Sequence, residues 1–320
     1  MRFDIDAGGT VLVTGGAGFI GSYVVRELAS RGCRVRVLDN MYRADPAVVV
    51  EQERLPGVEL VEGDIRYRAA VDRAVAGTDA VVHLAALAIN KSIAAPEESV
   101  EVNLNGSQNV FAAAAEAGVR RLVFASSASV YGEPRTLPML EDGPLDPKTP
   151  YCIAKLAGEY LLRFYERTAE LDWTALRLFN VYGPGQRTDA YYTTVVLLFV
   201  ERLLAGDPPV IDGDGAQTMD FVHVRDVAHA VVRSLESEAS RQVVNIGTGT
   251  QTSIAELAGV LIELVGSDVE PEFRPRDVLV TRRAADVERA SAVLGWTPSV
   301  GVKEGLAEVV EAIVGERGPG

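Results

Sequence analysis

Tyr151 and Lys155 are the two residues whose types and spacing point most directly to chemistry. They stand four apart in the segment YCIAK, and Thr149 and Pro150 before them are a favourable N-cap and first residue for a helix. Side chains four apart share one helix face, and an ammonium beside a phenol lowers the pKa of the phenol. We therefore expect Tyr151, helped by Lys155, to remove a proton from a substrate hydroxyl. An exposed Tyr–Lys pair on a surface helix is the alternative interpretation.

Three serines stand together in ASSASVYG, residues 125–132, where the apolar run RLVFA ends. A serine hydroxyl can bond to both a reacting hydroxyl and a phenol without carrying charge, so Ser127 is predicted as a third catalytic residue that also contacts substrate. Ser126 is expected to support the strand end, and Ser129 to lie beside the substrate. The segment contains no Asp or Glu, so it offers no acid that could protonate a leaving group.

A glycine-rich turn stands between a strand pattern and a helix pattern in VLVTGGAGFIGS. The spacing of Gly15, Gly18 and Gly21 allows a tight turn, a close approach of a pyrophosphate to the backbone, and packing of the helix on the strand. Asp39 ends the next strand pattern, RVRVLDN, where a carboxylate binds the ribose hydroxyls of NAD and repels the 2′-phosphate of NADP. NAD is therefore the predicted cofactor, and hydride transfer from the hydroxyl-bearing carbon is the predicted chemistry.

Further cofactor contacts are expected where the other strands of the same sheet end. Asp64 and Ile65 follow the third strand pattern, although Asp64 could equally be a turn residue, and the small residues of HLAA follow the fourth. His83 in that segment is predicted to be a hydrogen-bonded core histidine. The residues predicted to contact NAD are Gly15, Gly18, Phe19, Ile20, Gly21, Asp39, Asn40, Asp64, Ile65, Leu84, Ala85, Ala86, Tyr151 and Lys155.

The elements that must position these residues follow an alternating pattern. Short β-branched segments such as TVLVTG and RVRVLDN alternate with amphipathic or Ala-rich helical segments. This predicts an α/β fold, a Rossmann-type doubly wound parallel sheet with a smaller C-terminal substrate-binding lobe. Residues 1–180 are expected to form the NAD-binding domain. Residues 181–320 are expected to form mainly the substrate-binding lobe, with one helix at about 190–205 and segments at about 226–250 that return to the first domain.

The composition disfavours several other classes of protein. The chain has 31 Lys and Arg against 45 Asp and Glu, and its net charge of −14 argues against nucleic acid and anionic membranes as partners. The run VVLLFV at 195–200 is too short to cross a bilayer, and the acidic segment MRFDIDAGGT is unlike a secretory signal. Two cysteines without a disulfide or metal spacing predict a cytoplasmic protein, and three histidines predict no metal site.

Together, Gly15, Asp39, Ser127, Tyr151 and Lys155 resemble the extended short-chain dehydrogenase/reductase family, and within it the NAD-dependent nucleotide-sugar epimerases and dehydratases. The likeness covers nearly the whole chain and includes SSASVYG, RLFNVYGPGQ, VHVRDVA and NIGTG in the family's order. It implies a tightly held NAD, a lobe that binds a nucleoside diphosphate, and a homodimer built on a four-helix interface. It also implies that Asn180 faces the diphosphate and that Asn103 supports the cofactor region. Each Asn could instead satisfy loop backbone.

Two departures from the family pattern concern the substrate. Met219 in QTMDF stands where many members have an arginine that reaches the diphosphate. Arg274 in EFRPRDV matches the family's usual diphosphate arginine, and Arg276 stands where glycine is common. Arg276 could replace the missing charge or be a surface residue. Cys152 stands beside Tyr151 where a small residue is usual, and it is expected to pack rather than react.

The family's members oxidise C4 of the sugar and differ in the step that follows. Dehydratases carry an Asp-Glu pair where this chain has Ala128-Ser129, and glucuronate decarboxylases carry Glu at the position of Ser129. Epimerases need no acid there, so a UDP-sugar 4-epimerase is the predicted function. Arg187 in GPGQRTDA could instead bind a uronic-acid carboxylate, which would suit a UDP-glucuronate decarboxylase or 4-epimerase. A non-catalytic NAD-binding scaffold is the remaining alternative.

Overall fold

The fold is built on one parallel sheet of seven strands in the order β11-β6-β5-β4-β1-β2-β3. The structure, a computed structural model, describes residues 8–187, 194–275 and 282–317. The chain runs outward from β1 to β3, then crosses back and runs outward again from β4, which confirms the predicted fold class. The strands are β1 Thr10–Thr14, β2 Arg34–Asp39, β3 Val58–Glu62, β4 Ala80–His83, β5 Arg121–Ser127, β6 Trp173–Leu178 and β11 Gln242–Ile246.

Helices cover both faces of the sheet, which is why its inner strands β1, β4 and β5 are buried almost throughout. One layer comprises α1 (Phe19–Ser30), α9 (Val224–Glu236) and α11 (Glu288–Leu294). The opposite layer comprises α3 (Arg68–Val75), α6 (Ser107–Glu116) and α7 (Pro150–Ala169). The connecting elements are α2 (Pro46–Arg54), α4 (Ile89–Ala94), α5 (Pro96–Ser99), the π-helix η2 (Val100–Gly106) and the 3₁₀ turn η3 (Ala128–Tyr131).

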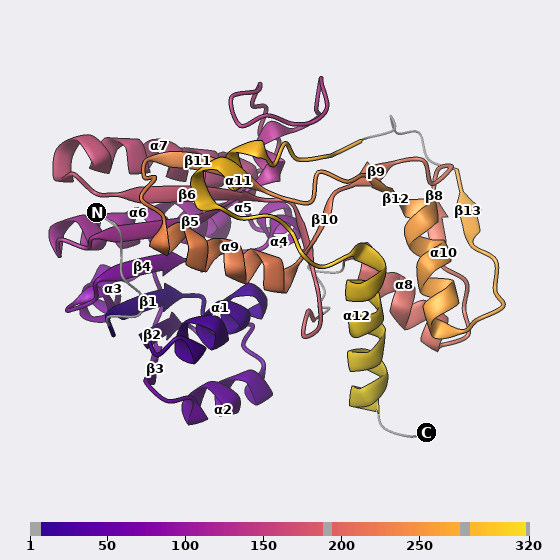
Figure 1. The fold of residues 1–320 in the computed structure, drawn as a ribbon, viewed down its shortest axis with the longest axis horizontal. Coiled ribbons are helices and arrows are strands. Elements are labelled where there is room, and N and C mark those ends of the chain that lie inside the picture. The colour runs from indigo at the N-terminus through magenta and orange to yellow at the C-terminus, as the bar shows by residue number, and fades with distance from the viewer. Residues whose placement is uncertain (1–7, 188–193, 276–281, 318–320) are drawn as a thin grey trace.

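A smaller lobe with its own apolar core lies beside one end of the sheet (Figure 1). Its helices are α8 (Val195–Leu204), α10 (Ile254–Val265) and α12 (Val302–Arg317). The helix expected at about 190–205 thus begins at Val195 in the described chain, where Thr194 is the N-cap and accepts from the N–H of Leu197. Three strand pairs complete this region: β7 (Asn180–Tyr182) with β10 (Phe221–His223), β9 (Thr218–Met219) with β12 (Thr252–Ser253), and β8 (Val210–Asp212) with β13 (Glu272–Arg274).

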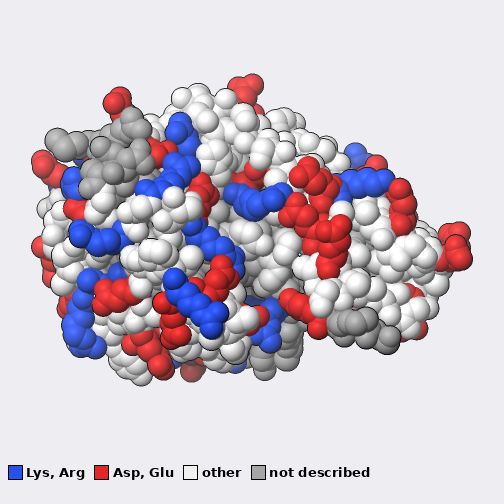
Figure 2. Space-filling view, turned by 60° about the horizontal axis from the view of Figure 1, so that its bottom comes forward, with Lys and Arg blue, Asp and Glu red and all other residues white. Residues whose placement is uncertain are grey.

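The surface and composition of the described chain add two further observations. Basic side chains are interspersed with acidic ones on the face drawn in Figure 2. Among the described residues, no helix is both long and apolar enough to span a membrane, and no cluster of His, Cys, Asp or Glu could hold a metal ion.

Candidate active site

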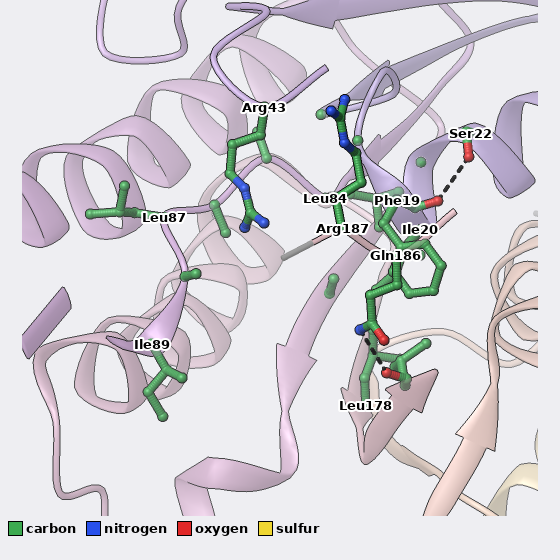
Figure 3. A pocket seen from close by; sticks show the side chains of 18 of the residues that line it. Phe19, Ile20, Ser22, Arg43, Leu84, Leu87, Ile89, Leu178, Gln186 and Arg187 are labelled. Carbon is green, nitrogen blue, oxygen red and sulfur yellow. Dashed lines mark hydrogen bonds between the residues drawn. The ribbon is translucent and has the colours of Figure 1, made fainter. Parts of the chain in front are cut away.

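A large cleft opens at the carboxyl ends of β1, β2, β4 and β5 and has a volume of about 1000 Å³. The crossover between β1 and β4 creates it, because the chain leaves these two strands in opposite directions. Loops of the smaller lobe complete its wall. The pocket drawn in Figure 3 receives Phe19 and Ile20 from α1, Leu84 from the loop after β4, and Gln186 and Arg187 from the loop after β7.

The glycine turn brings backbone atoms of three segments unusually close together. Gly15 has φ +71°, and a Cβ on it would lie 2.7 Å from the backbone nitrogen of Ala85. A Cβ on Gly21 would lie 2.2 Å from the carbonyl oxygen of Gly15, so α1 packs directly on the turn. The N-terminus of α1 therefore points its backbone N–H groups into an open cleft, which fits the pyrophosphate of a dinucleotide.

Asp39 lies at the end of β2 and lines the cleft. Its two oxygens accept from the backbone N–H groups of Ala17 (3.0 Å) and Met41 (2.9 Å). Burial raises the pKa of Asp39, while the hydrogen bonds from Met41 and Ala17 act against this. Each oxygen keeps a second lone pair, so the carboxylate can still accept from the hydroxyls of a ribose. The residues present thus fit NAD.

Asn40 and Asp64 lie together on the same side of the cleft. The Asn40 amide donates to Asp64 Oδ2 at 3.0 Å, and Arg66 Nη2 donates to the same oxygen at 2.8 Å. Asp64 therefore makes structural contacts while lining the cleft, as the sequence interpretation allowed, and Ile65 lines the cleft beside it.

The loop after β4 is held from behind by Asn103 and His83. Asn103 accepts from the N–H of Leu87 at 2.7 Å and donates to the carbonyl of Leu87 at 3.1 Å. It is buried and does not line the cleft, so it supports the loop that carries Leu84, Ala85 and Ala86 rather than contacting the cleft directly. His83 is a core histidine as predicted, bonded to Thr14 and Ser107, and burial lowers its pKa to about 3.

Tyr151 and Lys155 stand in the first turns of α7 and both line the cleft. Thr149 is the N-cap, as expected, and accepts from the N–H of Cys152, which is buried. Lys155 is buried; its Nζ donates to the carbonyl of Ala125 in β5 at 2.7 Å and lies 5.5 Å from the centre of the Tyr151 ring. Burial lowers the pKa of Lys155 to about 7.

The Ser127 hydroxyl lies at the end of β5, in the same cleft. Its oxygen accepts from the backbone N–H of Ser129 at 3.2 Å and from the Ser129 hydroxyl at 2.8 Å. A hydroxyl has two acceptor sites and one donor, so these contacts leave its proton to be donated. The local turn η3 thus orients Ser127 as a donor toward the cleft without using an acid.

Glu159 is a buried acid beneath this segment that the sequence interpretation did not identify. Its carboxylate accepts from Ser126 Oγ at 2.6 Å and from Arg177 Nε and Nη2 at 2.9 and 2.7 Å. Burial acts to lower the pKa of Arg177, but the hydrogen bonds and charge of Glu159 outweigh burial and raise it. Because Arg177 and Ser126 occupy its oxygens, Glu159 supports the strand end and is not a proton donor to the cleft. Its place one turn after Lys155 on α7 is the sequence signal that could have indicated it.

The predicted substrate residues do not all come together in the structure. Asn180 and Met219 line the cleft, and the Asn180 amide donates to the carbonyl of Asp220 at 3.0 Å. Arg274 does not line it: its side chain is 56% exposed and donates to Glu272 at 3.0 Å. Arg276 lies outside the described residues.

Arg187 lines the cleft, but its Nη1 lies 3.4 Å from the carboxylate of Asp45, the N-cap of α2. This contact holds the guanidinium against the loop that follows Asp39 and Asn40. Arg187 thus lies near the part of the cleft predicted to bind the cofactor ribose, and its contact with a substrate carboxylate stays a prediction.

The chain is similar to known proteins along nearly its whole length. The model of the NAD dependent epimerase/dehydratase family matches residues 11–247. UDP-glucose 4-epimerase of Mycolicibacterium smegmatis is 39% identical over 309 residues, which are 94% of this chain and 97% of that protein. UDP-glucuronic acid decarboxylase 4 of Arabidopsis thaliana is 32% identical over 308 residues, 94% of this chain and 68% of that protein. The crystal structure of UDP-glucose 4-epimerase with UDP-glucose from Thermotoga maritima has a TM-score of 0.88 at 35% identity and covers 95% of this chain and 98% of that one.

The doubly wound sheet, the glycine turn and the Tyr151–Lys155 pair define an NAD-dependent enzyme of the extended short-chain dehydrogenase/reductase class. Within that class, the chain belongs to the NAD dependent epimerase/dehydratase family. NAD is its cofactor, as the glycine turn and Asp39 predicted.

Proposed function

We propose that this enzyme is a UDP-sugar 4-epimerase. The observation that carries the proposal is the makeup of the site: a phenol, a buried amine and two linked hydroxyls line the cleft, and residues 125–132 contain no acid. These groups can move one proton to and from a sugar hydroxyl. The similarity to UDP-glucose 4-epimerases over almost the whole chain supports the same reaction.

When bound, NAD supplies a hydride acceptor and donor for C4 of the sugar. The chain's own residues provide the proton chemistry. Tyr151 takes the proton of the C4 hydroxyl and returns it when that hydroxyl re-forms with the opposite configuration. Ser127 donates its hydroxyl proton to the oxygen at C4, which keeps this oxygen next to the phenol. The ammonium of Lys155 favours the phenolate form of Tyr151 because opposite charges attract strongly in a buried site.

Two regions of the chain divide the binding. We propose that residues 1–180, with the returning segments at about 226–250, bind NAD. Residues 181–320, together with Asn180 just before them, bind the UDP part of the substrate, with Asn180 and Met219 in the wall of the cleft. The UDP-sugar assignment rests on the relatives, whose names specify UDP-glucose and UDP-glucuronic acid.

UDP-glucuronate remains the alternative substrate, processed by decarboxylation to UDP-xylose or a 4-keto-pentose, or by 4-epimerisation. Similarity to a UDP-glucuronic acid decarboxylase supports it. Against decarboxylation stand Ser129, where that reaction's enzymes carry Glu, and the pairing of Arg187 with Asp45.

We further propose a homodimer formed through the exposed apolar face of α7 and its neighbours. Ile153, Tyr160 and Phe164 project from α7 and are each more than half exposed. Ile93 of α4 and Val100 of η2, two elements that pack against α7, are exposed as well. Apolar side chains gathered in this way mark an interface, and a second copy of the same face would cover them.

A cytoplasmic location also remains a proposal. It rests on Cys33 and Cys152, which are buried thiols and form no disulfide in the described chain.

The proposed function is tested by incubating the NAD-loaded enzyme separately with UDP-glucose, UDP-N-acetylglucosamine and UDP-glucuronate, and identifying the products by NMR. A product inverted at C4 is expected. A pentose product would replace the proposal with decarboxylation, and loss of the oxygen at C6 would replace it with dehydration.

The Tyr151→Phe variant separates the enzyme from a non-catalytic NAD-binding scaffold. Loss of the phenolic oxygen removes the proton acceptor, so turnover is expected to fall by about 10²- to 10⁴-fold while NAD stays bound. A scaffold would keep its cellular function in this variant.

A further inference from the structure

Arg283 is a cleft residue that the sequence interpretation did not single out. It follows Arg282, which forms an isolated bridge with Thr218, and its own backbone N–H donates to the carbonyl of Thr218 at 3.2 Å. Arg283 is thus fixed beside Met219, the position where the cation expected for the substrate's diphosphate is missing.

The guanidinium of Arg283 reaches from the smaller lobe to the catalytic strand. Nη2 donates to the carbonyl of Gly132 at 3.2 Å, and Gly132 ends the turn η3, which follows Ser127 and contains Ser129. This contact uses one of five N–H donors and leaves the side chain 25% exposed. The carboxylate of Glu133 lies 3.9 Å from Nη2 and its side chain is 63% exposed, so it neutralises the charge of Arg283 only weakly.

The other cleft residues make this charge more significant. After position 193, the described residues that line the cleft are Thr194, Val195, Val196, Met219, Phe221, Arg283, Ala312 and Glu316, and Arg283 is the one Lys or Arg among them. Among the described residues from 194 onward, Arg283 is therefore the fixed cation that an anionic substrate meets on this wall, in addition to Arg187 of the preceding loop.

We propose that Arg283 binds an anionic group of the nucleotide-sugar substrate and supplies the charge that Met219 does not. The proposal deepens the proposed function and rests on it. A guanidinium forms charge-assisted and often bidentate hydrogen bonds to both diphosphate and carboxylate oxygens, so the anion has two sources. It is either the diphosphate, which all UDP-sugars carry, or the C6 carboxylate of a uronic acid.

The test measures, by calorimetry on NAD-loaded protein, the affinities for UDP, UDP-glucose and UDP-glucuronate of wild type, Arg283→Gln and Arg282→Gln. The Arg282→Gln variant is the matched control, because it removes the same charge from the neighbouring residue. Arg282 is exposed and does not line the cleft. If Arg283 binds the diphosphate, all three ligands bind about 10- to 100-fold more weakly to Arg283→Gln. If Arg283 binds the carboxylate, only UDP-glucuronate binds more weakly to Arg283→Gln.

The proposal would be overturned if the affinities of Arg283→Gln for all three ligands were within twofold of those of Arg282→Gln. Arg283→Met, which keeps the length of the side chain, is measured in parallel and is subject to the same criterion if the Gln variant does not fold. A wild-type enzyme that binds none of the three ligands would instead overturn the proposed function, so the two failures are distinguishable.

Discussion

At the scale of the residue, Lys155 combines burial with a position beside the catalytic phenol. Burial disfavours the ammonium, and Lys155 has the carbonyl of Ala125 as a hydrogen-bond acceptor at 2.7 Å. Its pKa of about 7 lies near the pH at which the enzyme must work, so the charge that stabilises the phenolate is sensitive to small changes around the site.

The lowered pKa of Lys155 makes the free energy of unfolding depend on pH. Between about pH 7 and the ordinary lysine pKa of 10.5, the unfolded chain holds a proton on Lys155 that the folded chain has lost. Raising the pH over this window therefore favours folding, with a contribution that approaches about 1.4 kcal/mol per pH unit. Denaturant unfolding at several pH values should show this slope in wild type and lose it in Lys155→Met.

Lys148→Met is the control for that experiment because Lys148 is 61% exposed and pairs with Asp146 on the surface. It should keep the wild-type slope. An unchanged slope in Lys155→Met would mean that Lys155 keeps its proton in the folded state throughout this range.

The site residues that could be predicted from the sequence depend on spacing that is local in the chain. The residues that were not predicted depend on contacts between separated parts of the chain. Tyr151, Lys155 and the glycines act through spacing within one turn or helix, which a sequence displays directly. Arg283 and Glu159 owe their positions to Gly132 and Arg177, which lie far from them in the chain. The contact of Arg187 with Asp45 is likewise visible only in the folded chain.

At the scale of the element, the β1–α1 turn depends on the close approach of Gly15 to the loop after β4. In Gly15→Ala the new Cβ would meet the backbone of Ala85, so the turn and the loop after β4, which both line the cleft, must move apart. We expect NAD to bind at least about tenfold more weakly, in line with the cost of a strained left-handed residue plus the displaced backbone.

Gly32→Ala separates the effect of left-handed backbone strain from the effect of the close approach to Ala85. Gly32 has φ +79°, close to that of Gly15, but no atom lies within 4 Å of its added Cβ. It should lose a similar amount of stability from backbone strain while retaining NAD. Equal NAD affinities in the two variants would show that the close approach to Ala85 is unimportant for binding.

The second element-scale feature is the ion pair that joins α7 to β6 beneath Ser126. Arg177 and Glu159 are almost fully buried, so Glu159→Gln leaves a buried guanidinium without a countercharge. We expect a loss of about 3–5 kcal/mol in the free energy of unfolding by denaturant titration. In the exposed pair Lys303–Glu263, Glu263→Gln should cost less than about 1 kcal/mol. Similar losses in both variants would contradict the role given to the buried pair.

At the scale of the whole molecule, the exposed face of α7 predicts self-association. Phe164→Glu places a charge among the apolar side chains of that face, and light scattering should then give the monomer mass of 34.3 kDa where wild type gives twice that mass. Phe273→Glu on β13, which is similarly exposed and outside this face, should remain dimeric. A monomeric wild type would remove the basis of the dimer proposal.

The seven-stranded sheet could be predicted because each of its strands is a short β-branched run between helical segments. The smaller lobe could be predicted only in outline. Its strands are two or three residues long and pair across large separations, as β8 does with β13, so neither length nor periodicity identifies them. Substrate residues carried on such strands are therefore the part of the site that sequence alone defines least well.

The central claim is that the hydrogen at C4 leaves the sugar and returns to the same carbon from the other side. Incubation of the enzyme with UDP-glucose deuterated at C4, followed by NMR of the product, tests this directly. The account predicts a product inverted at C4 that retains its deuterium, because bound NAD would take it as hydride, which, unlike a proton on an acid or base, does not exchange with water. A product inverted at C4 with its deuterium exchanged for solvent hydrogen, or no inversion at C4, would contradict it.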